Sequence, residues 1–217
     1  MRTAIFDLDG TLVDTSRDLI AAANACFDGA APLDPEADAL TAFAGGRAML
    51  RLGLGRTGGD PAFADAWYAR FLDLYAEGID RESRLYPGAM EAVARLSAAG
   101  WRVGICTNKP AALAELLLTR LGVRDAFAAL IGADTLPVRK PDPAPYRAAV
   151  LRAGGDPARS FLIGDTVTDR DTARAAGVPV VLVSFGPEGP GIARLSPDAL
   201  LDSYDALDAL AERLIPH

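Results

Sequence analysis

Polar side chains that could act together in chemistry follow several short apolar runs in this sequence of 217 residues. Most are carboxylates, one is a lysine, and the others carry a hydroxyl or an amide group. In chain order these residues are Asp7, Asp9, Thr107, Asn108, Lys140, Asp165 and Asp169. The apolar runs are rich in Val, Ile, Leu and Phe, which is typical of strands buried on both faces of a parallel sheet. Because parallel strands meet at one edge with their carboxyl ends, we expect these side chains to converge on one crevice.

The chemistry of that set follows from its charges. Carboxylates held close together repel one another, so one takes up a proton or shifts its pKa strongly unless a cation relieves the repulsion. Hard oxygen ligands without His or Cys favour magnesium over zinc. One carboxylate could then act as a nucleophile, while Lys140 and Thr107 would supply a positive charge and a donor for an anionic substrate. The set predicts phosphoryl transfer, in which catalysis consists mostly of positioning and charge neutralisation.

Simpler interpretations exist for the residues taken one at a time. An Asp after a strand often caps the next helix, and Asp165 or Asp169 alone could do so. Asp7 and Asp9 do not fit that interpretation, because no helix is expected before Thr15. Two acids at the end of an apolar strand destabilise a fold unless they have a use. The joint pattern at several strand ends therefore favours a functional site.

Composition excludes several classes of function. The chain has 29 acidic and 22 basic residues and a net charge of −7, which argues against nucleic acid as a partner. Its one histidine is His217, so a Ser-His-Asp triad, a Cys-His pair and a multi-His zinc site are excluded. The acids at positions 7 and 9 interrupt any signal-peptide core, and no apolar run reaches 18 residues. We expect a cytoplasmic protein with no membrane partner.

The pattern of elements predicts an α/β fold. Short apolar runs alternate with helix-period stretches, as in a Rossmann-like parallel sheet with helices on both faces. The expected strands cover residues 3–6, 101–106, 128–132, 160–163 and 179–184. The expected helices cover residues 88–99, 111–121, 143–153, 168–176 and 204–214.

One region breaks this alternation. Residues 15–84 carry helix signals and no convincing strand, so we expect a helical insertion after the first strand, large enough for a small core of its own. Its first helix is expected to open with Thr15 and Asp18, which have capping-box spacing. Its last helix is expected over residues 62–78, with one apolar face made of Phe63, Trp67, Phe71 and Leu74.

Four segments resemble the motifs of the haloacid dehalogenase-type hydrolases, in the same order and over nearly the whole chain. They are DLDGTLVD from Asp7 to Asp14, the strand end at Thr107 and Asn108, RKPDP around Lys140, and GDTVTD from Gly164 to Asp169. The insertion resembles the helical cap of that family's first subclass. The resemblance implies a discontinuous catalytic core made of residues 1–14 and 85–217, and an all-helical cap domain made of residues 15–84.

The resemblance also implies a role for the first motif. Asp7 would attack phosphorus and become an aspartyl-phosphate. Asp9 would protonate the leaving alcohol and then activate the water that releases phosphate. Gly10 would allow the turn that directs Asp9 to the site. Thr11 would stabilise that turn and belong to the substrate-binding residues.

The other motifs would complete the site. Thr107 and the backbone of Asn108 would hold phosphate oxygens, and Lys140 would neutralise the nucleophile and the phosphate together. The implied cofactor is Mg²⁺. Its ligands would be Asp7, the backbone carbonyl of Asp9 and Asp165, with Asp169 in support.

The implied substrate is a small phosphorylated metabolite. The protein itself is expected to be a monomer or a homodimer. GADTLPVRKPDP, residues 132–143, resembles the corresponding stretch of bacterial phosphoglycolate phosphatases, which implies 2-phosphoglycolate. In that subgroup a Gly-rich cap loop faces the active site. The matching residues here are Gly45, Gly46 and Arg47, and Arg47 could pair with a substrate carboxylate. An Arg at a helix start is also commonly a solvated surface residue.

Several alternatives stay open at this point. The same chemistry could act on a nucleotide, a sugar phosphate or pyrophosphate, or serve a phosphosugar mutase. Dehalogenation is disfavoured because it needs neither the metal nor the second Asp of the first motif, and Asp9 and Asp165 are both present. Phosphonate hydrolysis is disfavoured because it would need a cap lysine, which residues 15–84 lack. A receiver-type signalling domain also combines an acidic cluster with Mg²⁺, but its acceptor Asp follows the third strand of a domain half this length. A binding protein without catalysis is disfavoured because every expected catalytic position is occupied.

Overall fold

The computed structural model describes residues 1–216, so the single histidine, His217, lies outside the described residues. The chain divides into two compact units. The α/β unit consists of Met1–Val13 and the chain from Leu85 onward, and the helical unit is Asp14–Arg84. Within the described residues, no helix has both the length and the apolar character needed to cross a membrane.

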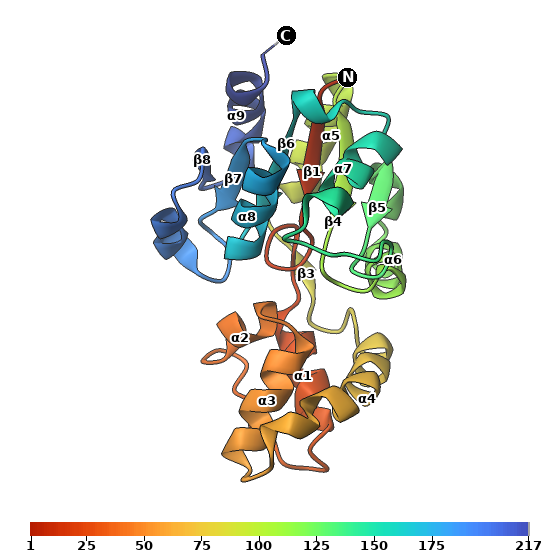
Figure 1. The fold of residues 1–217 in the computed structure, drawn as a ribbon, viewed down its shortest axis with the longest axis vertical. Helices are drawn as coiled ribbons and strands as arrows, with labels where there is room; N and C mark the ends of the chain where they lie inside the picture. The colour runs from red at the N-terminus through yellow and green to blue at the C-terminus, as the bar shows by residue number, and fades with distance from the viewer. Residues whose placement is uncertain (217) are drawn as a thin grey trace. The chain divides into compact units, whose positions relative to one another are not determined.

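A six-stranded parallel sheet forms the centre of the α/β unit (Figure 1). Its strands are β1 (Thr3–Phe6), β4 (Arg102–Cys106), β5 (Ala129–Ile131), β6 (Ser160–Gly164), β7 (Val180–Val183) and β8 (Ala199–Leu201). The order β5-β4-β1-β6-β7-β8 places β1 beside the point where strand order reverses, the usual place for ligands in such sheets. The predicted Rossmann-like α/β fold is confirmed, with β8 as a strand that the sequence pattern did not indicate.

Helices cover both faces of this sheet (Figure 1). Helices α7 and α8 contact each other on one face, and α5 and α9 contact each other on the other. The helices are α5 (Ala89–Ala98), α6 (Ala111–Arg120), α7 (Pro143–Arg152), α8 (Val167–Ala176) and α9 (Leu207–Leu214). Shorter 3-10 turns are η2 (Arg124–Ala126), η3 (Pro157–Arg159), η4 (Gly189–Leu195) and η5 (Tyr204–Ala206).

The central strands are almost entirely buried, which explains their largely apolar sequences. Ile5 of β1 and Leu162 of β6 are fully buried in a cluster with Tyr146 and Val150 of α7. Burial of this apolar surface is the main term that holds the carboxyl ends of the strands in a fixed arrangement. The sheet therefore provides a rigid support for the residues that follow each strand.

The helical unit is built from four helices and one 3-10 turn. They are α1 (Ser16–Ala25), α2 (Ala39–Phe43), α3 (Gly46–Arg56), η1 (Pro61–Phe63) and α4 (Ala64–Glu77). Helix α3 packs closely at two of its three glycines. A Cβ on Gly46 would lie 2.4 Å from the ring of Phe71, and one on Gly53 would lie 2.4 Å from the ring of Phe27.

Two short strands, β2 (Val13–Asp14) and β3 (Arg84–Leu85), pair where the chain passes between the units. Each strand has only two residues, too few to produce a recognisable alternation in the sequence. The sequence pattern therefore did not indicate them.

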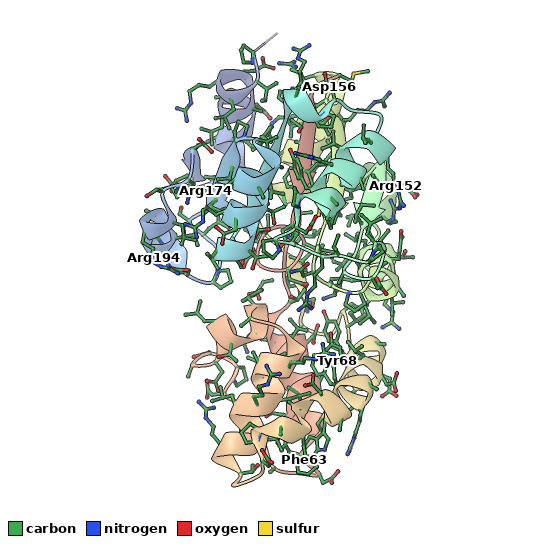
Figure 2. The ribbon with its side chains drawn as sticks, in the orientation of Figure 1. Phe63, Tyr68, Arg152, Asp156, Arg174 and Arg194 are labelled. Atoms are coloured by element: carbon green, nitrogen blue, oxygen red, sulfur yellow. The ribbon has the colours of Figure 1, made fainter. Side chains whose placement is uncertain are left out.

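Two local predictions for the helical unit are wrong. Thr15 makes no side-chain cap on α1, and the Asp18 carboxylate instead accepts hydrogen bonds from the backbone N–H groups of Glu82 and Ser83. A distant segment therefore supplies the donors that a capping box would have supplied locally. Phe63 is not buried: it ends a 3-10 turn before α4 begins and is 57% exposed (Figure 2).

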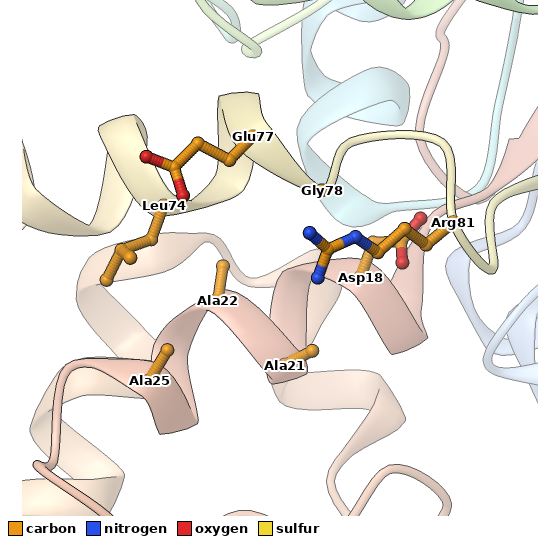
Figure 3. A pocket seen from close by; sticks show the side chains of 8 residues that line it. All are labelled: Asp18, Ala21, Ala22, Ala25, Leu74, Glu77, Gly78 and Arg81. Atoms are coloured by element: carbon orange, nitrogen blue, oxygen red, sulfur yellow. The ribbon is translucent and has the colours of Figure 1, made fainter.

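The helical unit also has a small pocket between α1 and α4 (Figure 3). Three alanines of α1 form one wall, and the remainder is contributed by α4 and the segment after it. The lining residues are Asp18, Ala21, Ala22, Ala25, Leu74, Glu77, Gly78 and Arg81. None of the motif residues lines this pocket.

Candidate active site

Three neighbouring strands of the α/β unit end in candidate site residues. Asp7 directly follows β1, Thr107 follows β4, and Asp165 follows β6. Asp7 donates its backbone N–H to the carbonyl of Ile163 at 2.8 Å, and Thr107 donates to Ile131 at 2.9 Å. The hydrogen-bonding pattern of the sheet thus extends to these residues and fixes where their side chains begin.

A cluster of three carboxylates occupies this edge of the sheet. Asp7, Asp165 and Asp169 each offer one oxygen, and these oxygens all lie within 4.8 Å of one another. All three residues are buried. Burial is the main reason that the pKa of Asp7 is raised to about 6. Burial also raises the pKa of Asp165 well above its ordinary value, with repulsion from Asp169 and Asp7 as further causes.

Lys140 neutralises part of this negative charge. Its Nζ lies 2.6 Å from Asp169 Oδ1 and 3.0 Å from Asp7 Oδ2, and the residue is 3% exposed. Burial by itself lowers the pKa of the ammonium group, but Asp169 and Asp7 together outweigh that effect and raise it above its ordinary value. Asn108 holds the loop in place by donating its side-chain N–H to the Lys140 carbonyl at 3.0 Å.

Asp169 serves both the fold and the cluster. Its Oδ2 accepts hydrogen bonds from the Thr166 backbone N–H at 3.1 Å and from the Thr166 hydroxyl at 2.6 Å. The first of these bonds, with the Asp169 N–H donating to the Thr166 hydroxyl oxygen at 3.4 Å, forms a capping box at the start of α8. Asp169 Oδ1 is the oxygen that contacts Lys140. The preceding Gly164 makes room, because a Cβ there would lie 2.3 Å from Asp169 Cγ.

The chain turns back sharply after Asp7. The Leu8 carbonyl accepts hydrogen bonds from the N–H groups of Leu12 and Val13 at 3.0 and 3.1 Å. Gly10 has a φ of +78°, in the region that favours glycine. This tight turn carries Asp9 and Thr11 into the neighbourhood of the first carboxylate.

Thr11 is fixed from both sides. Its hydroxyl donates to Asp165 Oδ1 at 2.9 Å, and its carbonyl accepts from the Tyr204 hydroxyl at 2.7 Å. Both contacts are buried, so Thr11 links the turn after β1 to the end of β6. Tyr204 lies far away in the sequence, and no local pattern could have indicated this contact.

Asp9 has a partner that the motif analysis missed. The Nζ of Lys109 lies 2.8 Å from Asp9 Oδ1, and Lys109 is 6% exposed. The signal that could have found it is its position immediately after the Thr107–Asn108 motif. A lysine next to a strand-end motif is placed to point at the same crevice.

Gly45, Gly46 and Arg47 belong to the helical unit. Gly45 has a φ of +99° just before α3. Arg47 Nε lies 2.5 Å from Asp65 Oδ1, and its guanidinium carbon lies 3.6 Å from the ring centroid of Tyr68. The role of these residues in substrate binding stays a prediction.

The three-carboxylate cluster fits a magnesium ion. All of its side-chain donors are hard oxygens, and the three buried carboxylates gather negative charge that a divalent cation would stabilise. No histidine or cysteine belongs to this donor set. The residues therefore match the preference of Mg²⁺ rather than that of zinc or copper.

A buried acidic cluster at the switch point of a Rossmann-like sheet is a site for chemistry on anionic substrates, and comparison with known proteins defines the family. Residues 1–177 match the haloacid dehalogenase-like hydrolase family. The phosphoglycolate phosphatase of Mesorhizobium japonicum is 41% identical over 216 residues, covering 97% of this chain and 95% of that protein. That of Rhodospirillum rubrum is 41% identical over 214 residues, covering 95% and 89%.

A solved structure gives the same result. The crystal structure of a predicted phosphoglycolate phosphatase from Haemophilus somnus has a TM-score of 0.83 and 26% identity, and the match covers 97% of each chain. The chain belongs to the haloacid dehalogenase-like hydrolase family. It is a hydrolase of the phosphatase type, and the resemblance inferred from its four motifs is confirmed.

Proposed function

We propose that this enzyme is a magnesium-dependent phosphatase that forms an aspartyl-phosphate on Asp7 and acts on 2-phosphoglycolate. The observation that carries the mechanism is the buried contact of Lys140 with both Asp7 and Asp169. This ammonium group lies where a nucleophilic carboxylate and a phosphate would both need positive charge. The residues fill the positions of the family's motifs.

In the first step, an oxygen of Asp7 forms a bond to phosphorus and the bond from phosphorus to the alcohol oxygen breaks. The leaving oxygen takes a proton from Asp9. Lys140 offsets the charge on the nucleophile and the phosphoryl oxygens, and Thr107 donates its hydroxyl to one of those oxygens.

In the second step, a water oxygen attacks phosphorus and Asp9 accepts a proton from that water. The bond between Asp7 and phosphorus breaks, and its electron pair returns to the Asp7 carboxylate. Asp7, Asp165 and Asp169, together with the Asp9 carbonyl, would hold Mg²⁺. When bound, the ion supplies positive charge that relieves the carboxylate repulsion and offsets the charge of the phosphate.

The proposal of 2-phosphoglycolate as substrate is supported by the relatives that carry this activity in their names, at about 41% identity over nearly their whole length. Residues 15–84 would serve as the cap that selects the substrate, with Arg47 as the candidate partner of the glycolate carboxylate. A fork of N–H donors suits a carboxylate, a group that pyrophosphate and ordinary nucleotides and sugar phosphates lack.

The test is a phosphate-release screen of small phosphorylated metabolites, with magnesium and with EDTA. We expect magnesium-dependent release that is fastest from 2-phosphoglycolate. A flat profile over nucleotides, sugar phosphates and pyrophosphate would contradict the substrate. Full activity in EDTA would contradict the cofactor.

A further inference from the structure

Lysine is rare in this protein, and where it occurs it is buried. The chain has two lysines, Lys109 and Lys140, and all its other basic side chains are arginines. The two residues are 6% and 3% exposed, and both stand at the same edge of the sheet. A buried ammonium group destabilises a fold unless a carboxylate accompanies it. Each buried lysine is therefore expected to contact a carboxylate.

The two lysines have different partners. Lys140 contacts Asp7 and Asp169, whereas Lys109 Nζ contacts Asp9 Oδ1 at 2.8 Å. The Lys109 side chain is 3% exposed and that of Asp9 is 20% exposed. The lysine is thus the enclosed member of the pair, and Asp9 is the member that remains accessible.

The backbone of Lys109 is fixed on both sides. Its N–H donates to the Thr107 hydroxyl oxygen at 3.2 Å, and its carbonyl accepts from the N–H of Ala133 at 2.9 Å. Asp9, in contrast, lies on the turn after β1. The ion pair therefore anchors a side chain on a turn to a residue held by the end of β4.

We propose that Lys109 is a positioning residue that holds the Asp9 carboxylate for hydrolysis of the phosphoenzyme. The inference rests on the proposed function, because it takes Asp9 as the group that accepts a proton from water. After the first step Asp9 has given its proton to the alcohol and is a carboxylate. Lys109 holds that carboxylate through Oδ1 while the carboxylate receives the water proton, water bonds to phosphorus and the Asp7–phosphorus bond breaks.

This role predicts a split between the two steps in Lys109→Met, measured with p-nitrophenyl phosphate. Nitrophenolate is a good leaving group that needs no proton, so formation of the phosphoenzyme should proceed nearly as before. Phosphoenzyme hydrolysis should slow by roughly tenfold or more, a part of the roughly 100-fold or larger contribution that a general base typically makes. We therefore expect a nitrophenolate burst close to one per enzyme molecule, a lower kcat and a nearly unchanged kcat/KM.

Matched variants separate this role from a structural one. Arg152→Met removes one exposed positive charge from α7 and should change neither constant, and Lys109→Arg should restore much of the lost kcat. If Lys109→Met does not fold, Lys109→Gln is measured in its place. Parallel loss of kcat and kcat/KM without a burst, or no loss at all, would overturn the inference.

Asp9→Asn distinguishes failure of this inference from failure of the proposed function. We expect Asp9→Asn to show the same burst and low kcat, and Lys109→Met to add little in that background because both changes act on one group. If Asp9→Asn shows the burst and Lys109→Met does not, only the role of Lys109 is wrong. If Asp9→Asn retains the wild-type kcat, the role proposed for Asp9 is wrong, and this inference is overturned with it.

Discussion

The residues of the site carry more buried negative charge than positive charge. Asp7, Asp165 and Asp169 are carboxylates within reach of one cation, and Lys140 is the ammonium group that contacts two of them. When all are ionised, negative charge exceeds positive charge by two. Burial is the main cause of the raised pKa values of Asp7 and Asp165, and repulsion from neighbouring carboxylates adds to it. A divalent cation has the charge that balances the excess.

The first prediction concerns the pH dependence of stability in EDTA. Burial raises the pKa of Asp7 from 3.8 to about 6, so the folded state binds this proton more tightly than the unfolded state. The contribution of the Asp7 proton to the free energy of unfolding is fully present below about pH 4 and is lost as pH rises through 6. This loss amounts to at most about 3 kcal/mol. We expect the free energy of unfolding of wild type, relative to Asp7→Asn, to fall over this range in urea titrations. A difference that rises with pH would contradict the assignment.

The second prediction concerns Arg47 and the substrate carboxylate. Losing one charge-assisted contact should raise KM for 2-phosphoglycolate about tenfold in Arg47→Ala. KM for p-nitrophenyl phosphate, which has no carboxylate, should change little. The control is Arg51→Ala on the same helix, since Arg51 also lies near Asp65, at 3.7 Å. Equal effects of the two variants in steady-state kinetics would contradict a specific role for Arg47.

At the scale of elements, strand ends and the turns after them place the functional groups. Three of the strands that end at the site are adjacent in the sheet, so residues 7, 107 and 165 meet although they are far apart in the chain. The capping box of α8 then orients Asp169, and Gly164 leaves the space that its carboxylate occupies. A small change in an element can therefore disable the site without altering a catalytic group.

The third prediction is that Gly164→Ala loses activity. The new methyl group would lie 2.3 Å from Asp169 Cγ, so the carboxylate would have to leave Lys140. We expect kcat to fall by roughly 100-fold, the effect that a small misplacement of catalytic groups can have. Gly55→Ala adds the same methyl group in α3, where nothing lies within 4 Å, and should be neutral. Wild-type kcat in Gly164→Ala would show that Asp169 does not need its observed position.

The same elements explain what the sequence could predict. The strands before Asp7, Thr107 and Asp165 are largely apolar, so their ends and their convergence follow from local patterns. The Asp9–Lys109 pair and the Tyr204–Thr11 contact join distant segments, and no periodicity encodes them. The capping box expected at Thr15 does not form for a similar reason. The N–H groups that the Asp18 carboxylate accepts from lie in a segment more than sixty residues away.

At the scale of the whole molecule, the chain forms two units with separate cores. Ile5 and Leu162 belong to the core of the α/β unit, while Met49, Phe71 and Tyr75 are buried in the helical unit. The carboxylates and both lysines of the site belong to the α/β unit, and Arg47 belongs to the helical unit. The proposed chemistry therefore belongs to the α/β unit, and the proposed choice of substrate to the helical unit.

The fourth prediction is that magnesium stabilises the whole protein through the carboxylate cluster. At roughly 100 times Kd, binding adds about 2.7 kcal/mol to the free energy of unfolding. For a chain of this length that corresponds to a rise in Tm of roughly 5–10 °C. Asp165→Asn should remove most of the rise, and Asp171→Asn, a half-exposed residue on α8, should keep it. A wild-type Tm that does not respond to magnesium in differential scanning calorimetry would contradict the metal site.

The central claim is that Asp7 carries the phosphoryl group, and chemical trapping tests it most directly. Enzyme quenched in acid during turnover of 2-phosphoglycolate with magnesium is reduced with borohydride, which converts an aspartyl-phosphate to homoserine. The reduced residue is then located by peptide mass spectrometry. The account predicts homoserine at position 7 and none in Asp7→Asn. Modification at another carboxylate, or steady turnover in Asp7→Asn, would contradict it.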